Sequence, residues 1–159
     1  MTRYKQPVSV LVVTFSVDPS AELRTGLEVL LLERADHPNY WQSVTGSCEP
    51  GEVLRDTALR EVREETGLDA SQYALSDWQL QNVYEIYPHW RHRYPPGITR
   101  NTEHVFGLQL PHPVAIRLAK REHLSFQWLA WQDAAEKVFS PSNRAAILEL
   151  PARANREMP

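Results

Sequence analysis

The sequence has a single cysteine, Cys48, among its 159 residues. One cysteine excludes an internal disulfide framework, and such scarcity is typical of a reducing compartment. Long apolar runs are also missing, because none approaches the roughly 18–20 residues that a membrane-spanning helix needs. The formal net charge is only -3, which gives no electrostatic argument for a general nucleic-acid binder. We therefore expect neither a nucleic-acid partner nor a membrane partner.

The apolar run from Val8 to Val17 superficially resembles a signal peptide, since Arg3 and Lys5 precede it. No small-residue cleavage site follows the run, and Asp18-Pro19-Ser20 is typical of a turn. The β-branched valines of the run favour a buried strand instead. We therefore expect a cytoplasmic protein.

Length and composition favour one globular domain. Domains commonly contain about 100–150 residues, and the hydrophobic and charged fractions, 42% and 23%, are close to globular averages. We expect a single domain over residues 1–150, followed by a frayed tail over residues 151–159.

Periodicity and turn residues predict more strand than helix, which indicates an α+β sandwich. The predicted strands are Val8–Val17, Leu27–Arg34, Trp41–Thr45, Glu103–Leu110 and Ser125–Ala130, with one or two more within Tyr73–Tyr87. The predicted helices are Val53–Thr66, ended by Gly67 as a left-handed cap, Asp133–Phe139, and Asn143–Leu150 with Ser142 as N-cap. Pro88–Arg100 is expected to be irregular.

The net charge is confined to one window of the chain. Between Gly46 and Leu68 there are six acidic and three basic residues, so the window carries 3 - 6 = -3. The remainder has 14 acidic and 14 basic residues, which cancel. This distribution is a first indication that something cationic binds in the window.

Three carboxylates of this window share one face of the predicted helix. At about 100° per residue, Glu61 and Glu65 lie about 40° apart, and Glu64 lies about 60° to the other side. Like charges at this spacing destabilise an isolated helix, and a hard divalent cation such as Mg²⁺ or Mn²⁺ would relieve the repulsion. The alternative is a solvated face on which Arg60 and Arg63 pair with the glutamates.

The spacing around these residues resembles the Nudix box. The motif has three parts here: Gly46, then Glu52 after five intervening residues, then the run Arg60–Leu68 after seven more. Together they match every fixed position of the Nudix box. The resemblance implies an α/β/α sandwich with a mixed sheet, in which the box forms a loop–helix–loop. It also implies a Mg²⁺-dependent hydrolase, with Mn²⁺ as a substitute, that cleaves nucleoside diphosphates linked to another group.

The resemblance also implies roles for individual residues. Glu61 and Glu65 are the expected metal ligands with the carbonyl of Gly46, and Glu64, which lies nearby, is an expected catalytic residue. Arg60 is expected to orient a glutamate and to pair with Glu52. Glu122, in a loop outside the box, is the candidate for a base or a further metal ligand, and the alternative is an exposed turn glutamate. The neighbouring His123 is expected to pack or to face solvent.

A second segment, Tyr87–Glu103, interleaves arginines and histidines with aromatic residues. Arginines clamp phosphates and aromatic rings stack on flat heterocycles, so the segment suits a triphosphate attached to a planar ring. Single-stranded RNA and a surface loop held by cation–π contacts remain alternatives. Arg34 is a candidate phosphate ligand or a strand-end ion pair with Glu33 or Asp36. The expected substrate-binding residues are Arg34, Trp41, Trp90, Arg91, Arg93, Tyr94 and Arg100.

Several short motifs resemble the bacterial dihydroneopterin triphosphate pyrophosphohydrolases of folate biosynthesis. They are Pro7–Ser9, Trp41–Ser47, Arg91–Tyr94, Thr99–Glu103, Glu122–Leu124 and Ser142–Arg144. The resemblance implies that 7,8-dihydroneopterin triphosphate is hydrolysed to the monophosphate and pyrophosphate. Two alternatives are a nucleotide-pool enzyme acting on (d)NTPs and a non-catalytic module that binds nucleotide or RNA. The sequence gives no indication of the oligomeric state.

Overall fold

The computed structural model describes residues 3–18, 20–22 and 25–157. Its strands are β1 (Val8–Val17), β2 (Leu27–Arg34), β3 (Trp41–Gln42), β4 (Val44–Ser47), β5 (Ala74–Glu85), β6 (Arg100–Leu110) and β7 (His123–Ala130). Its helices are α1 (Leu54–Thr66), α2 (Trp131–Lys137), α3 (Pro141–Leu148) and α4 (Leu150–Glu157), with short 3-10 helices η1 (Ala70–Gln72) and η2 (Pro88–Arg93). Among the described residues, no helix has the length and apolar character needed to span a membrane.

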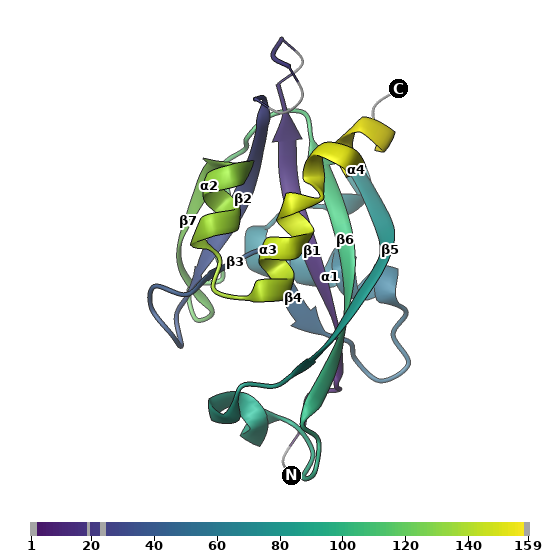
Figure 1. The fold of residues 1–159 in the computed structure, drawn as a ribbon. Helices are drawn as coiled ribbons and strands as arrows, with labels where there is room; N and C mark the ends of the chain where they lie inside the picture. Colours follow the sequence, from purple (N-terminus) through teal and green to yellow (C-terminus); the bar gives the residue numbers. More distant parts are fainter. Residues whose placement is uncertain (1–2, 19, 23–24, 158–159) are drawn as a thin grey trace.

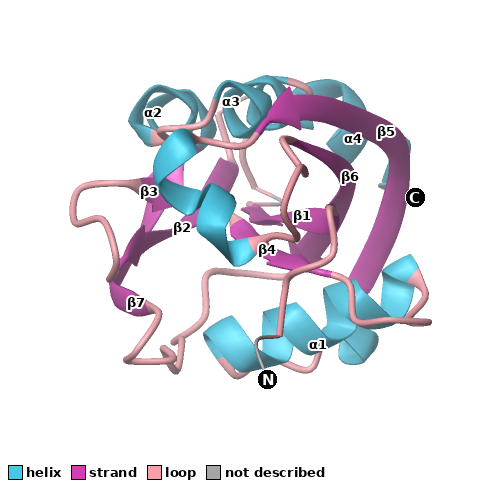
Figure 2. Cartoon of the chain, turned by 90° about the horizontal axis from the view of Figure 1, so that it is seen from below, coloured by secondary structure: helices cyan, strands magenta, loops and turns pink. Residues whose placement is uncertain are grey.

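The strands form one mixed sheet between two helical layers. The strand order is β3-β2-β1-β6-β5, with β4 paired to β1 and β7 paired to β2. β1 and β6 run parallel, and the other pairs are antiparallel. Helix α1 covers one face of the sheet, and α2, α3 and α4 cover the other (Figures 1 and 2). The predicted α+β sandwich with a mixed sheet is therefore confirmed.

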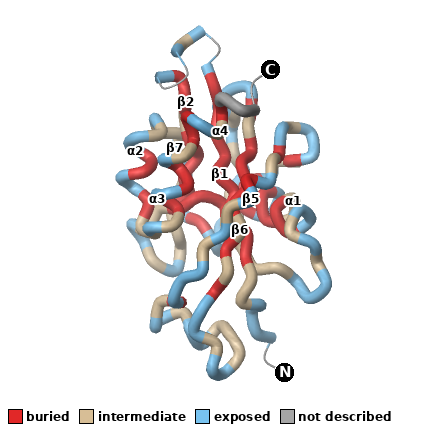
Figure 3. Tube along the Cα trace, turned by 45° about the vertical axis from the view of Figure 1, so that its right-hand side comes forward, coloured by how far each residue is buried: buried red, intermediate tan, exposed pale blue. Residues whose placement is uncertain are grey.

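β1 lies at the centre of the sheet and is buried on both faces (Figure 3). Val10 and Val12 pack in the core beneath α1, whereas Leu11 and Val13 pack in the core beneath α2, α3 and α4. A strand covered on both faces needs no polar alternation, which explains its nearly continuous apolar sequence. The buried strand that was expected in place of a signal peptide is thus confirmed.

The bounds predicted for β1, β2 and the end of α1 agree with the structure, and Gly67 has the expected left-handed φ of 77°. The strand expected over Trp41–Thr45 is instead two short strands, because the chain shifts at Ser43 from pairing with β2 to pairing with β1. The prediction of Ser142 as a helix cap was wrong. α3 starts earlier, and the hydroxyl of Ser140 accepts the hydrogen bond from the backbone N–H of Asn143.

The prediction of a frayed tail over residues 151–159 was wrong for residues 151–157, and residues 158–159 lie outside the described part of the chain. Residues 150–157 form α4, which lies against the sheet beside β5 and β6 (Figure 1). Leu150 and Ala154 are fully buried in the core. Arg153 donates a 2.9 Å hydrogen bond to the carbonyl oxygen of Trp78 and lies over its indole ring. A short polar tail is ordered here because tertiary contacts, not helix propensity, stabilise it.

The packing of Trp78 against β6 requires a glycine at position 107. A Cβ built on Gly107 would overlap the indole ring of Trp78. We expect Gly107→Ala to lower the free energy of unfolding by about 2 kcal/mol, because a buried rigid ring cannot easily move away. Urea denaturation measures this change.

The overlap itself can be tested with a double-mutant cycle. If Trp78 causes the loss, adding Gly107→Ala to Trp78→Leu will cost much less than Gly107→Ala costs alone. Additive losses would contradict the packing explanation.

Candidate active site

Two of the three glutamates predicted to share a face of helix α1 point into the protein. Its buried stripe contains Ala58, Val62 and Thr66, as the sequence predicts. The adjacent positions Glu61 and Glu65 consequently face β4 and are 8% and 1% exposed. The structure therefore places these two carboxylates on one face of the helix, as the sequence predicts. The side chain of Glu64 is half exposed at the edge of the helix.

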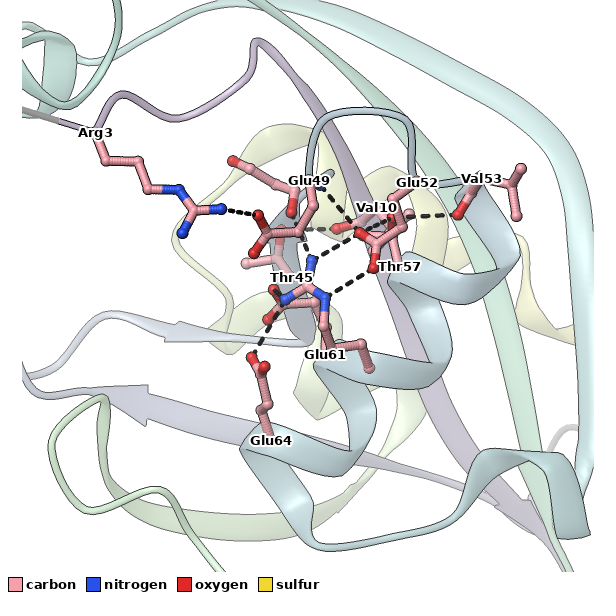
Figure 4. A network of polar contacts seen from close by, with 11 residues as sticks. Arg3, Val10, Thr45, Glu49, Glu52, Val53, Thr57, Glu61 and Glu64 are labelled. Atoms are coloured by element: carbon pink, nitrogen blue, oxygen red, sulfur yellow. Dashed lines mark hydrogen bonds and ion pairs between the residues drawn. The ribbon is translucent and has the colours of Figure 1, made fainter.

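Arg60 holds the carboxylates at the start of this face. Figure 4 shows three of these carboxylates, those of Glu52, Glu61 and Glu64. Arg60 donates to both oxygens of Glu52 at 2.9 Å, to Glu61 at 2.8 Å, to Glu64 at 3.4 Å and to the carbonyl of Ser47 at 3.0 Å. The guanidinium has five N–H donors, and each has an acceptor here. Arg60 lowers the pKa of Glu52 to about 2, so that this carboxylate stays ionised. The expected pairing of Arg60 with Glu52 is present.

Gly46 of β4 makes room for the carboxyl group of Glu61. A Cβ at position 46 would overlap that carboxyl group. The β1–β4 pairing places Gly46 opposite Val10, and the backbone of β4 thereby lies directly beneath α1. The first glycine and the first metal-ligand candidate of the motif, 15 positions apart in the sequence, are therefore in contact.

The carboxylate of Glu65 is buried without a protein hydrogen bond. Neither of its oxygens has a hydrogen-bond partner within the part of the chain that the structure describes. Burial, followed by the neighbouring carboxylate of Glu61, raises the pKa of Glu65 well above its ordinary value. The Nε2 atom of His123 lies 3.6 Å from Glu65, but burial lowers the pKa of His123 to about 4 and leaves it neutral. Such an arrangement is costly unless a cation binds there.

Glu61 and Glu65 line a cleft of about 860 Å³, called here the carboxylate cleft. Its walls include Glu61, Glu65, His123 and Glu122. The loop that carries Glu122 is held beside β2, since the carbonyl of Glu122 accepts a 2.9 Å hydrogen bond from Ala35. Glu64 is not among the lining residues, so its predicted catalytic role stays a prediction.

The donor set of the cleft fits a hard divalent cation. Carboxylate oxygens are the ligands that Mg²⁺ prefers, and Mg²⁺ commonly takes one or two carboxylates and completes its shell with water and substrate phosphates. Among the described residues, no three His, Cys, Asp or Glu side chains are already gathered into a cation cage. The two buried glutamates, with the unpartnered oxygens of Glu65, match this partial mode of binding.

Cationic side chains line the other side of the cleft. Arg34 donates two 2.7 Å hydrogen bonds to Asp36, and Arg93 donates one of 2.8 Å to the same carboxylate. The two arginines hold the pKa of Asp36 far below its usual range. Arg34 therefore forms the expected ion pair with Asp36 and also lines the cleft, and its role as a phosphate ligand stays a prediction. Lys5, which was not predicted as a site residue, lines the cleft beside them.

The carboxylate cleft continues into a second cavity of about 350 Å³, the aromatic pocket. The two cavities share lining residues, including Lys5, Arg34, Gly46 and Arg93. The walls of the aromatic pocket are mainly apolar and carry the rings of Tyr84, Tyr87, Trp90, Tyr94 and Phe139. Arg34 lies over Trp90, with its guanidinium carbon 4.3 Å from the ring centroid. The predicted Trp90, Arg93 and Tyr94 therefore meet in one place.

Three of the predicted substrate-binding residues do not line either cavity. Trp41 packs against the core, and the ammonium of Lys137 lies over its ring. Arg91 donates to the carbonyl of Ile86, and Arg100, whose side chain is 71% exposed, pairs with Glu85. The arginines stabilise the end of the β5–β6 pair. Both arginines lie outside the two cavities here, because sequence proximity to Arg93 does not fix the direction of their side chains, and their role in substrate binding stays a prediction.

Three polar residues of the aromatic pocket belong to motif segments of the sequence but were not predicted to bind substrate. They are Asn101, Glu103 and Asn143, and all three are buried. Asn143 accepts from the backbone of Ser43 and donates to its hydroxyl, and so joins α3 to the segment between β3 and β4. A charged residue at an inward position of a predicted strand was the available signal for Glu103.

Comparison with known proteins agrees with this geometry. A model of the NUDIX domain matches residues 6–150. The chain is 48% identical over 146 residues to the dihydroneopterin triphosphate diphosphatase of Escherichia coli strain K12, with 91% of each chain covered. It is 40% identical to the enzyme of the same name from Haemophilus influenzae, covering 92% of this chain and 89% of the relative. The structure of the E. coli dihydroneopterin triphosphate pyrophosphohydrolase matches with a TM-score of 0.84 at 46% identity, covering 94% of this chain and 98% of that one. The chain therefore belongs to the Nudix family.

Proposed function

We propose that this protein is a Mg²⁺-dependent pyrophosphohydrolase that converts 7,8-dihydroneopterin triphosphate to dihydroneopterin monophosphate and pyrophosphate. The observation that carries the proposal is the continuity of the carboxylate cleft with the aromatic pocket. A polyphosphate can lie between the buried glutamates and the arginines while an attached ring enters the pocket. The names and the high identity of the relatives from E. coli and H. influenzae support the same substrate.

Glu61 and Glu65 would hold Mg²⁺, for which Mn²⁺ can substitute, and the carbonyl of Gly46 would be a further ligand. Bound Mg²⁺ neutralises phosphate charge and lowers the pKa of a coordinated water. Glu122 reaches the same cleft from the opposite loop. We infer that it accepts the proton of the attacking water or serves as another ligand.

The remaining residues of the site position these groups. Arg60, anchored by Glu52, holds Glu61 in place through its 2.8 Å hydrogen bond. Arg34 and Arg93 can contact phosphate oxygens, because Asp36 fixes their planar side chains at the junction of the two cavities. Positioning and electrostatic stabilisation of this kind supply much of the rate enhancement in phosphoryl chemistry.

Substrate profiling tests the proposal directly. With saturating Mg²⁺, purified protein should release pyrophosphate from dihydroneopterin triphosphate with a higher kcat/KM than from any common nucleotide. The reason is that the rings of the aromatic pocket can stack on a flat ring while the adjoining cleft holds its triphosphate. A coupled pyrophosphate assay gives the values, and mass spectrometry identifies the monophosphate.

The same assay separates the alternative functions. A higher kcat/KM for a dNTP would replace the proposed substrate by a nucleotide and leave the enzyme class intact. Absence of metal-dependent turnover of every triphosphate would contradict the enzymatic function and favour a binding module.

A further inference from the structure

The aromatic pocket contains two buried acceptor atoms that have no protein donor. Asn101 and Glu103 are 1% and 4% exposed and lie on the same face of β6. The next residue on that face, Val105, already belongs to the core beneath α2, α3 and α4. The Oδ1 atom of Asn101 and the Oε1 atom of Glu103 accept no hydrogen bond within the described residues. Buried polar atoms are rarely left unpaired, so these two indicate a ligand that brings donors.

The sheet places both acceptor residues side by side. The amide nitrogen of Asn101 donates to the hydroxyls of Ser9 and Tyr84, at 2.7 and 3.1 Å, which leaves Oδ1 free to accept. The parallel pairing of β1 with β6 places Ser9 opposite Glu103. The hydroxyls of Ser9 and Tyr84 therefore hold the amide of Asn101 before any ligand enters, and β6 places Glu103 next to it on the same face.

We propose that Glu103 and Asn101 recognise the edge of a ring that carries an N–H beside an exocyclic amino group. Pterins and guanine share this edge, which is the 2-amino-4-oxopyrimidine unit. Two adjacent donors on the ring match two acceptors on neighbouring side chains of the pocket. The assignment rests on the proposed function, because it names the residues that recognise the ring in the same site.

The proposal predicts discrimination against adenine. The corresponding edge of adenine offers one amino donor next to a ring-nitrogen acceptor, and that acceptor would face a buried carboxylate oxygen. Unpaired buried acceptors penalise the wrong substrate more than extra contacts reward the right one. Burial raises the pKa of Glu103, and the nearby side chains of Ser142 and Asn82 lower it in part, so an ionised Glu103 carries a desolvation cost. A ring with two donors offsets that cost.

The test is the substitution Glu103→Gln, assayed with dihydroneopterin triphosphate, dGTP and dATP. The amide keeps the shape of the side chain but replaces one acceptor oxygen by a donor. We expect kcat/KM to fall about 100-fold for the pterin and for dGTP, mainly through KM, and to change less than about three-fold for dATP. Glu136→Gln, at an exposed site on α2, is the matched control and should leave all three values unchanged.

The dATP values show whether the variant remains folded and active. An equal loss for all three substrates, or an unchanged ratio of pterin to adenine activity, would overturn the proposal. If the wild-type protein does not hydrolyse dihydroneopterin triphosphate, the proposed function fails, and the ratio of dGTP to dATP alone decides the role of Glu103. If Glu103→Gln does not fold, the wild-type protein can be assayed with dITP, which lacks the 2-amino group. A kcat/KM for dITP about ten-fold below that for dGTP supports the proposal, and equal values refute it.

Discussion

Replacing Glu65 by glutamine is expected to abolish catalysis without unfolding the protein. Glu65 is 1% exposed, and neither of its oxygens has a hydrogen-bond partner in the described structure. A neutral amide of the same shape would lose the charge that binds Mg²⁺. We expect kcat to fall about 1,000-fold or more, which corresponds to roughly 4 kcal/mol of lost transition-state stabilisation.

The stability of the same variant gives an independent readout. A buried carboxylate without a partner destabilises the metal-free protein, so Glu65→Gln should be as stable as the wild type or more stable by about 1 kcal/mol. Adding Mg²⁺ should raise the Tm of the wild type, because ligands that bind the folded state stabilise it, and this rise should vanish in the variant. Thermal denaturation with and without Mg²⁺ measures both effects, with Glu136→Gln as the control. Retained activity, or an unchanged metal-induced rise in Tm, would refute Glu65 as a metal ligand.

The substitution Gly46→Ala should separate activity from stability in a different way. The new Cβ would overlap the carboxyl group of Glu61, which is the flexible end of a long side chain. The side chain can move aside at little cost, so we expect the free energy of unfolding to change by less than about 1 kcal/mol. The displaced carboxylate would no longer be aligned beside Glu65, and we expect kcat/KM to fall about 100-fold.

Shortening the displaced side chain supplies the control for this prediction. In the double variant Gly46→Ala, Glu61→Asp, the shorter carboxylate makes room for the Cβ, and part of the activity should return. Steady-state kinetics of the single and double variants give the comparison. Wild-type activity in Gly46→Ala would show that close contact between positions 46 and 61 is not needed. A large loss of stability would show that the backbone of β4, rather than Glu61, responds to the change.

The elements predicted well from the sequence are those that local physical chemistry determines. β1 and β2 are long β-branched and leucine-rich runs between turns, and α1 ends where Gly67 takes a positive φ. Long-range contacts decided the elements that were missed. Residues 150–157 have little reason to be helical alone, and α4 forms because Leu150 and Ala154 complete the core.

The candidate site shows the same division. Helical periodicity is enough to place Glu61 and Glu65 on one face, and a fixed motif spacing indicates Arg60 and Glu52 as their partners. Periodicity does not determine which of these side chains another element buries. In the structure β4 covers Glu61 and Glu65, whereas the side chain of Glu64 is half exposed.

The set of residues that line the aromatic pocket depended still more on the tertiary structure. Trp90, Arg93 and Tyr94 line the pocket, whereas Arg91 is turned to Ile86 and Glu85 by local hydrogen bonds. Glu103 and Asn143 enter the same pocket from β6 and α3. The contact between Ser43 and Asn143 joins positions 100 residues apart, and no local pattern specifies such a pair.

The sequence by itself determined the chemistry of one half of this protein's site. A single window, Gly46–Leu68, carries the whole net charge of -3, and its spacing specifies a helix with paired carboxylates. Only the tertiary structure decided what lies opposite, because the pairing of β1 with β4 and β6 brings distant residues to the same cavity. Charge and helical period are local properties of a chain, whereas the burial that leaves Glu65 and Glu103 without partners exists only after the strands have paired.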